Sequence, residues 1–311
     1  MRGKIVLLYE TERGKALCDA ASYVLTQVAV AFGHALTLPV KKCEPVADVS
    51  DALLDLCADA EGILVGDGDM ACLPALADEL LCASRVRELR YTHLIENRAL
   101  MGLARPLNAV LIQALSSEEE ALAATAKLAY TVSARENLAI LQVPPTGKLA
   151  AAWKKAVDAA DSLTAPFHAW ELPLPRAIPD MIHRPQHCGV LLCPPYAGYV
   201  LADAAAALAG AQGMGYDAYV GGQCGLLSAL RQEDDALNPF GMLRAVTHLL
   251  RSELKLDQEA ACVEAALRNV LQAGWRTPDI SLKPDKIMDA EGICDLVCQQ
   301  IEVAGDWINN K

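Results

Sequence analysis

Aromatic residues and a surplus of basic residues are what this sequence most lacks. Only 5% of its 311 residues are aromatic although 53% are hydrophobic, so the core must be built mainly from aliphatic side chains. Its 27 lysines and arginines are outnumbered by 39 aspartates and glutamates, which gives a formal net charge of -12. Because no cationic surplus is left to neutralise phosphates, a nucleic-acid partner is not expected.

Long apolar runs are also missing. Charged residues interrupt every apolar stretch well short of the roughly 20 residues that a membrane-spanning helix needs. The chain opens directly into the strand-like residues 4–8 without the layout of a signal peptide, so we expect no membrane partner and a cytoplasmic location. The 11 cysteines are scattered without tight CxxC pairs, which predicts reduced and buried thiols.

Strand-like and helix-like segments alternate along the first 70 residues. Strands are predicted at residues 4–10, 35–39 and 62–67, and they are separated by an amphipathic helix at 15–32 and a short helix at 51–60. Alternation of this kind predicts a largely parallel sheet with helices on its faces.

The rest of the chain continues the pattern less regularly. Further strands are predicted at residues 108–115, 137–144 and 188–195. A proline-rich stretch at 162–185 and a glycine-rich stretch at 210–225 are typical of loops, and the chain after them is predicted to be helical.

Five segments, taken in order, carry a resemblance to a known family. They are residues 4–33, 60–69, 85–94, 184–215 and 238–280. The last two are the most specific, since one ends in the glycines of GAQGMG and the other in RTPDI. Together they resemble the metal-dependent β-decarboxylating dehydrogenases, the isopropylmalate and isocitrate dehydrogenase family, and the chain is identified as a divergent member.

This resemblance implies a particular architecture. It implies an α/β, isopropylmalate dehydrogenase-like fold of two domains, with a mixed sheet flanked by helices, that is not a Rossmann fold. Residues 1–98 and 222–311 would form the large domain from both chain ends, and residues 99–221 a smaller dimerisation domain. Because the family's cleft lies between the domains and borrows residues from the partner subunit, a homodimer is expected.

The metal position is the first chemical departure from the family. Oxidative decarboxylation of a 2-hydroxy acid needs a divalent cation held by carboxylates, and the family places two aspartates one helical turn apart. In this sequence those positions hold Tyr199 and Asp203. A phenol stays protonated and uncharged near neutral pH, so Asp203 is the single candidate ligand and neither magnesium nor manganese is expected to bind well.

The substrate positions differ as well. Arg85 matches the family's first substrate arginine, whereas Ile95 and Gln113 stand where the other two should be. No residue is assigned a catalytic role. His93 is the one histidine expected near the cleft, and a structural role is its simpler interpretation. The polar residues expected to line the cleft are Arg85, Tyr91, His93 and Tyr199.

The cofactor loop is the third departure. In place of the family's HGSAPD loop, residues 221–239 run GGQCGLLSALRQEDDALNP, and only Asn238 and Pro239 survive. Asn238 is therefore the only candidate for cofactor binding. The first turn keeps one glycine, Gly14, so NAD is expected only if the chain is still an active enzyme.

Three hypotheses follow. The favoured one is a catalytically degenerate homologue with a ligand-binding or regulatory role as a dimer, acting on its own or with an active paralogue, whose small-molecule ligand the sequence does not identify. The second is an active NAD(P)- and Mg/Mn-dependent decarboxylase of a malate-type 2-hydroxy acid, in which Lys148, Asp180 and Asp217 replace the missing groups. The third is a new enzyme that reuses the inter-domain cleft.

Overall fold

The computed structural model describes residues 1–89, 109–163, 168–209, 212–232, 237–281 and 286–309. The chain forms two compact units. Unit 1 comprises Met1–Leu80, Gln212–Ala218 and Gln223–Lys311, and unit 2 comprises Leu81–Ala211 and Tyr219–Gly222. The predicted boundary between residues 98 and 99 lies outside the described residues, so the predicted domain limits stay a prediction.

The sheet of unit 1 is built on buried parallel strands. Its strands are β1 (Arg2–Tyr9), β2 (Ala35–Thr37), β3 (Val40–Lys42), β4 (Gly62–Val65), β10 (Tyr216–Val220, which continues into unit 2) and β11 (Gly225–Ala229). They follow the order β2-β1-β4-β11-β10, and β3 also pairs with β1. β1 is parallel to β2 and β4, and β4 to β11. The apolar runs in β1 and β4 are fully buried, as expected for central parallel strands.

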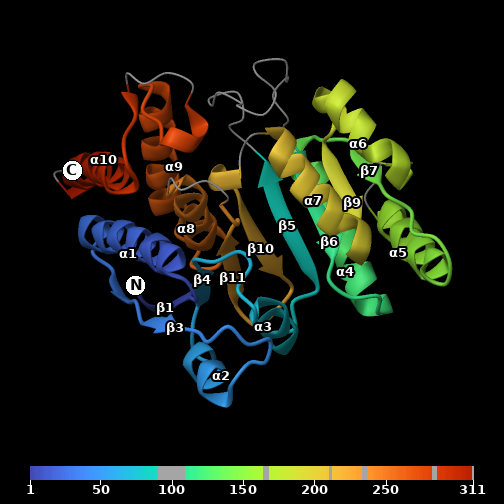
Figure 1. The fold of residues 1–311 in the computed structure, drawn as a ribbon, viewed down its shortest axis with the longest axis horizontal. Helices are drawn as coiled ribbons and strands as arrows, with labels where there is room; N and C mark the ends of the chain where they lie inside the picture. The colour runs from blue at the N-terminus through green and yellow to red at the C-terminus, as the bar shows by residue number, and fades with distance from the viewer. Residues whose placement is uncertain (90–108, 164–167, 210–211, 233–236, 282–285, 310–311) are drawn as a thin grey trace. The chain divides into compact units, whose positions relative to one another are not determined.

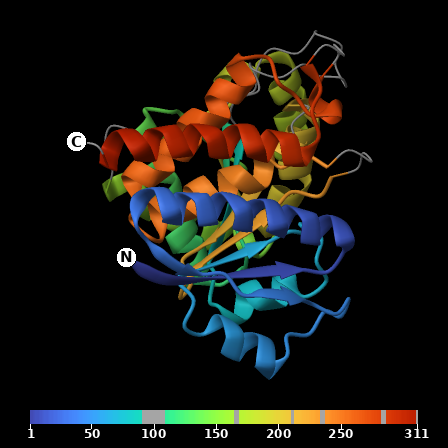
Figure 2. The ribbon, with the colours of Figure 1, turned by 90° about the vertical axis from the view of Figure 1, so that its left-hand side faces the viewer.

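Helices cover this sheet on both sides. They are α1 (Glu12–Phe32), α2 (Asp51–Cys57), α3 (Leu73–Glu79), α8 (Phe240–Ser252), α9 (Asp257–Gln272) and α10 (Ala290–Asn309). α1 and α10 lie side by side on one side of the strands and α2 on the other (Figure 2). α1 begins at the capping side chain of Thr11 and ends at Gly33, whose φ of 70° lies in the left-handed region that favours glycine.

Unit 2 contains a mixed sheet. Its strands are β5 (Ser84–Leu89), β6 (Ala109–Ala114), β7 (Ile140–Gln142), β8 (Ala169–Glu171) and β9 (Val190–Cys193). They follow the order β5-β6-β9-β7-β8, in which β5 and β6 are antiparallel and the later pairs are parallel. The helices are α4 (Glu119–Glu136), α5 (Leu149–Leu163), α6 (Leu174–His183) and α7 (Pro195–Ala209), of which α4 and α7 both pack on β6 and β9 (Figure 1). Short 3₁₀ turns occur at Pro185–His187 in unit 2, and at Gln212–Met214 and Pro278–Ile280 in unit 1.

Two predicted loops are wrong. The proline-rich stretch contains β8 and α6, and the glycine-rich stretch contains β10 and ends where β11 begins. Pro175 falls in the first turn of α6, where its missing N–H is harmless, and packing against α7 supports the helix although Pro179 lies inside it. In the glycine-rich stretch, Gly221 has a φ of 95° and makes the turn between two strands.

The predicted state of the cysteines is confirmed. All 11 are free thiols, and nine of them are buried. Burial raises the pKa of the Cys18 thiol to about 12, so it stays protonated near neutral pH and behaves as a small apolar group. Within the described ranges, no helix is long and apolar enough to cross a membrane.

Candidate functional site

Two buried arginines on β5 are the centre of the first candidate site. Arg85 and Arg87 are only 6% and 4% exposed. Because side chains alternate along a strand, both lie on the same face of β5, and α7 packs against this strand. Two guanidinium groups so nearly removed from water must be held by partners. The site formed by Arg85, Arg87, Gln113, Tyr199 and Asp203 is called the arginine site below.

Arg85 is held by Gln113 and Tyr199. Gln113 lies directly opposite Arg85 in the β5–β6 pairing, and its Oε1 accepts a hydrogen bond of 2.5 Å from Arg85 Nη2. Gln113 Nε2 donates in turn to the carbonyl oxygen of Pro195, the first residue of α7. The ring of Tyr199 lies 4.4 Å from the Arg85 guanidinium carbon, a cation–π contact. Tyr199 thus serves Arg85 where the family resemblance implies a metal ligand.

Arg87 holds the single predicted metal ligand. Its Nη1 lies 2.7 Å from Asp203 Oδ1, although the Asp203 side chain is 78% exposed. Tyr199 and Asp203 are one helical turn apart on α7. Arg85 contacts the first of them and Arg87 contacts the second. Arg87 was missed in the sequence, but the alternation of β5 could have identified it as the second arginine on the face of Arg85.

The side chains of the arginine site do not fit a divalent cation. Among the described residues, Asp203 is the one carboxylate of this site, and a metal ion beside it would lie next to the positive charge of Arg87. Across the described part of the chain, no group of three or more His, Cys, Asp or Glu side chains could hold a metal ion. The charge of this site is therefore the reverse of what a magnesium or manganese centre requires.

Close packing of α7 on β6 holds the arginine site in place. A Cβ atom added to Gly198 of α7 would lie 2.3 Å from Gln113 Cγ. This contact is far too short for any real side chain, so glycine is what allows α7 to lie directly over Gln113.

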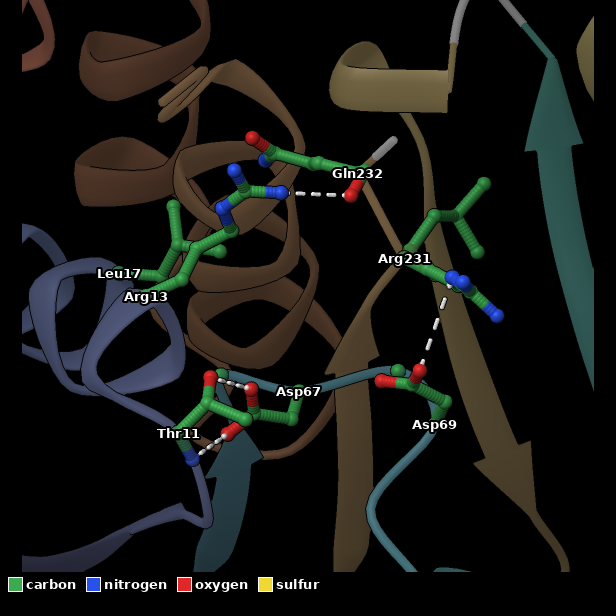
Figure 3. Close-up of a pocket in the computed structure, with 10 residues that line it drawn as sticks. Thr11, Arg13, Leu17, Asp67, Asp69, Arg231 and Gln232 are labelled. Carbon is green, nitrogen blue, oxygen red and sulfur yellow. Dashed lines mark hydrogen bonds and ion pairs between the residues drawn. The ribbon is translucent and has the colours of Figure 1, made fainter. Parts of the chain in front are cut away.

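A second candidate site is a pocket of about 270 Å³ in unit 1, called the Asp67 pocket below (Figure 3). It lies where the parallel strands β1, β4 and β11 end, the edge at which open α/β sheets bind their ligands. Its lining comprises Thr11, Arg13, Leu17, Gly66, Asp67, Gly68, Asp69, Leu230, Arg231 and Gln232.

The carboxylate of Asp67 is satisfied inside the protein. Its Oδ2 accepts hydrogen bonds from the backbone nitrogens of Glu10 (2.7 Å) and Thr11 (3.1 Å), and its Oδ1 accepts one from the Thr11 hydroxyl. A Cβ added to Gly14 would lie 1.8 Å from the same carboxylate, so the one glycine kept in the first turn makes room for Asp67. The donors just before α1, which in other proteins often bind anions, are therefore already used.

Two arginines approach the Asp67 pocket from different segments (Figure 3). Arg13 on α1 donates through Nη1 to the Gln232 carbonyl at 2.6 Å, and Arg231, after β11, lies 3.7 Å from Asp69. The second pair is exposed and so contributes little to stability. Small-molecule pockets usually measure about 300–1,000 Å³, so the volume enclosed by the described residues lies just below this range.

Asn238, the predicted cofactor residue, is completely buried. Its Nδ2 donates to Asp279 at 2.7 Å, and its Oδ1 accepts from the Phe240 backbone nitrogen at 3.0 Å. These bonds hold the segment that leads into α8. Asn238 does not line the Asp67 pocket, and its role in cofactor binding stays a prediction.

The remaining predicted residues are scattered or lie outside the described ranges. Tyr91 and His93 belong to residues 90–108, which the structure does not describe. Of the groups that the active-enzyme hypothesis requires, Lys148 is exposed at the turn before α5, Asp180 lies on α6, and Asp217 is buried on β10. Of the predicted cleft residues, the structure therefore brings together Arg85 and Tyr199.

The known proteins that resemble this chain in sequence or structure include isopropylmalate and isocitrate dehydrogenases. Residues 174–297 match the family model described as isocitrate/isopropylmalate dehydrogenase. The 3-isopropylmalate dehydrogenase of Moorella thermoacetica is 23% identical over 184 residues, 57% of this chain and 52% of that protein. The same enzyme of Parasynechococcus marenigrum is 31% identical over 154 residues, 47% of this chain and 41% of that protein. The matches thus span about half the length of these relatives.

The structural likeness extends over almost the whole chain. Isocitrate dehydrogenase from Methylococcus capsulatus superimposes with a TM-score of 0.81 at 16% identity, covering 96% of this chain and 99% of that one. At such low identity the likeness establishes the fold alone. The predicted α/β fold, with a mixed sheet flanked by helices, is confirmed.

Proposed function

Because the chain belongs to the isocitrate/isopropylmalate dehydrogenase family, we propose that it is a catalytically degenerate member that binds a small organic anion in a ligand-binding or regulatory role. The observation that carries this proposal is the 2.7 Å ion pair between Arg87 and Asp203. It supplies positive charge where the family's chemistry needs a cluster of carboxylates around a cation. The donors present favour binding a carboxylate over activating a hydroxyl group.

The arginine site carries donors that suit an organic anion. Guanidinium groups bind carboxylates through paired, charge-assisted hydrogen bonds and keep their charge at any physiological pH. Asp203 is mostly exposed, so it can turn towards solvent and let an incoming anion approach Arg87. Arg85 is fixed by Gln113 and Tyr199 and would supply a second, rigid positive charge.

We propose further that the protein forms a homodimer through α6 and α7. These helices pack together and expose the large apolar side chains of Ile182, Tyr196 and Val200. Exposed apolar groups on neighbouring helices favour association with a matching surface, here a second copy of the chain or an active paralogue. Sedimentation of the wild type as a dimer and of Tyr196→Glu as a monomer would support this. Val46→Glu, which places the same charge at an exposed apolar residue of unit 1, is the control.

An activity assay tests the proposed loss of catalysis. The purified protein is given Mg²⁺ or Mn²⁺, NAD or NADP, and a panel of malate-type 2-hydroxy acids, with an active 3-isopropylmalate dehydrogenase as the positive control. We expect no cofactor reduction above background. Turnover of any of these acids at an ordinary enzymatic rate, about 1 s⁻¹ or faster, would overturn the proposal and favour the active decarboxylase.

A further inference from the structure

Unit 2 holds a larger pocket, of about 440 Å³, that shares no lining residue with the arginine site. It is called the β7 pocket below, because it lies at the ends of β7 and β8 beside α5. Its lining comprises Tyr130, Gln142, Pro144, Pro145, Ala150, Trp153, Lys154, Val157, Asp158, Asp161, His168, Ala169 and Glu171. Its volume suits a small organic molecule.

A buried amide supplies hydrogen-bond donors to the β7 pocket. Gln142 is only 8% exposed, and its Oε1 accepts a hydrogen bond of 2.8 Å from the indole nitrogen of Trp153. Since an indole N–H can only donate, the bonded atom of Gln142 must be its oxygen, and the amide nitrogen is left for another partner. Among the described residues this nitrogen has no acceptor. The side chain is held by Trp153 and lines the pocket, so its amide nitrogen is a positioned donor that is open to an acceptor on a ligand.

A fixed carboxylate lies in the wall of the same pocket. Asp161 accepts a hydrogen bond of 2.7 Å from the hydroxyl of Tyr130 and lies 3.0 Å from Nδ1 of His168. The hydrogen bond from Tyr130, followed by the contact with His168, holds the pKa of the Asp161 carboxyl below its usual range. Asp161 is therefore negatively charged and held in place at neutral pH.

The remaining lining makes the β7 pocket acidic with apolar walls. Asp158 and Glu171 add two carboxylates, and Lys154, paired with Asp158 at 2.7 Å, adds one ammonium group. Three carboxylates against one ammonium group leave a negative balance, which attracts cations and repels anions. The prolines, alanines and Val157 supply aliphatic surface for a short carbon chain.

We infer that the β7 pocket binds a small aliphatic amine that also carries a hydroxyl or carbonyl oxygen. The ammonium group would pair with the carboxylates of Asp161 and Glu171, and the oxygen would accept a hydrogen bond from the amide of Gln142. The aliphatic body would pack on the apolar walls. This site shares no residue with the proposed anion site, so the loss of binding at either site should leave binding at the other unchanged.

Titration of the full-length protein with three probes tests the inference, with binding followed by two-dimensional NMR. The probes are 4-amino-1-butanol, butylamine and butyrate. We expect saturable binding of the amino alcohol, weaker binding of butylamine and no binding of butyrate. Glu171→Gln should weaken the amino alcohol about 10-fold, the loss of one close charge pair. Gln142→Leu should abolish its advantage over butylamine.

Matched variants make the result decisive. Glu44→Gln removes an exposed carboxylate in unit 1 and should leave binding unchanged. Asp161→Asn should weaken binding at least as much as Glu171→Gln, and if it fails to fold, the exposed Glu171 still tests the inference. No saturable binding of either amine up to tens of millimolar would overturn it. Equal binding of butyrate, or unchanged affinity in Glu171→Gln, would overturn it as well.

Discussion

Asp67 in unit 1 and Asp203 in unit 2 are both carboxylates at positions where ligands are expected, yet their surroundings differ in every respect. Asp67 is 7% exposed and accepts hydrogen bonds from two backbone nitrogens and a hydroxyl, donors that belong to fixed parts of the fold. Asp203 is 78% exposed and pairs with a single guanidinium group. The first carboxylate is therefore part of the architecture, and we propose that a ligand can displace the second.

The arginines differ in the opposite direction, since the exposed one lies in unit 1 and the buried ones in unit 2. Arg231 of the Asp67 pocket is mostly exposed, whereas Arg85 and Arg87 are buried. A buried guanidinium has lost most of its hydration, so its attraction for an anion is stronger than that of an exposed one. Ligand binding is thus expected in unit 2 and structural support in unit 1.

The largest effect is expected for Asp67→Ala. It leaves two backbone N–H groups and a hydroxyl without their acceptor, so the free energy of unfolding should fall by about 2–4 kcal/mol. Urea unfolding measures this, and Asp203→Ala is the comparison variant, with a smaller expected loss of about 1 kcal/mol, because an exposed partner of the buried Arg87 is removed. Equal losses in both variants would erase the comparison.

Arg87→Ala should weaken carboxylate binding next most strongly. Removing one charge-assisted contact is worth about 1.5–3 kcal/mol, so the affinity for a dicarboxylate such as malonate should fall about 10- to 100-fold by calorimetry in the presence of EDTA. Arg13→Ala removes an arginine from the Asp67 pocket and should leave this affinity unchanged. If Arg13→Ala had the larger effect, the anion would bind in unit 1.

Gly198→Ala should lower the free energy of unfolding by about 1–3 kcal/mol, because its Cβ would overlap the side chain of Gln113. The cost should become smaller in a Gln113→Ala background, where the overlapping atoms are gone. A double-mutant cycle by urea unfolding measures the difference. If the two changes in unfolding free energy were strictly additive, the Cβ at position 198 would not overlap Gln113.

The smallest effect is expected for Asp203→Asn. The exposed side chain contributes little, so the free energy of unfolding should change by less than about 0.5 kcal/mol. The affinity for malonate should rise a few-fold, because the internal competitor for Arg87 loses its charge. An affinity that falls instead would indicate that Asp203 contacts the ligand directly.

Local patterns in the sequence predict much of the fold but only part of the sites. β1, α1 and β4 follow from strong apolar periodicity, whereas α6 was hidden by its prolines and is supported by tertiary packing. Arg85, Tyr199 and Asp203 could be identified by position. The alternation of β5 could also have placed Arg87 on the face of Arg85, but its pairing with Asp203 and the contacts of Asp67 could not be predicted, because they join residues 116 and 56 positions apart, which only the folded chain brings together.

Binding of Mn²⁺ tests the central claim most directly. Titration of the purified wild-type protein with Mn²⁺, followed by electron paramagnetic resonance of the free ion, measures the metal without requiring turnover. The reversed charge of the arginine site predicts that all added Mn²⁺ stays free at micromolar concentrations. Stoichiometric binding with micromolar affinity, lost in Asp203→Asn, would contradict the account and restore a metal-dependent dehydrogenase.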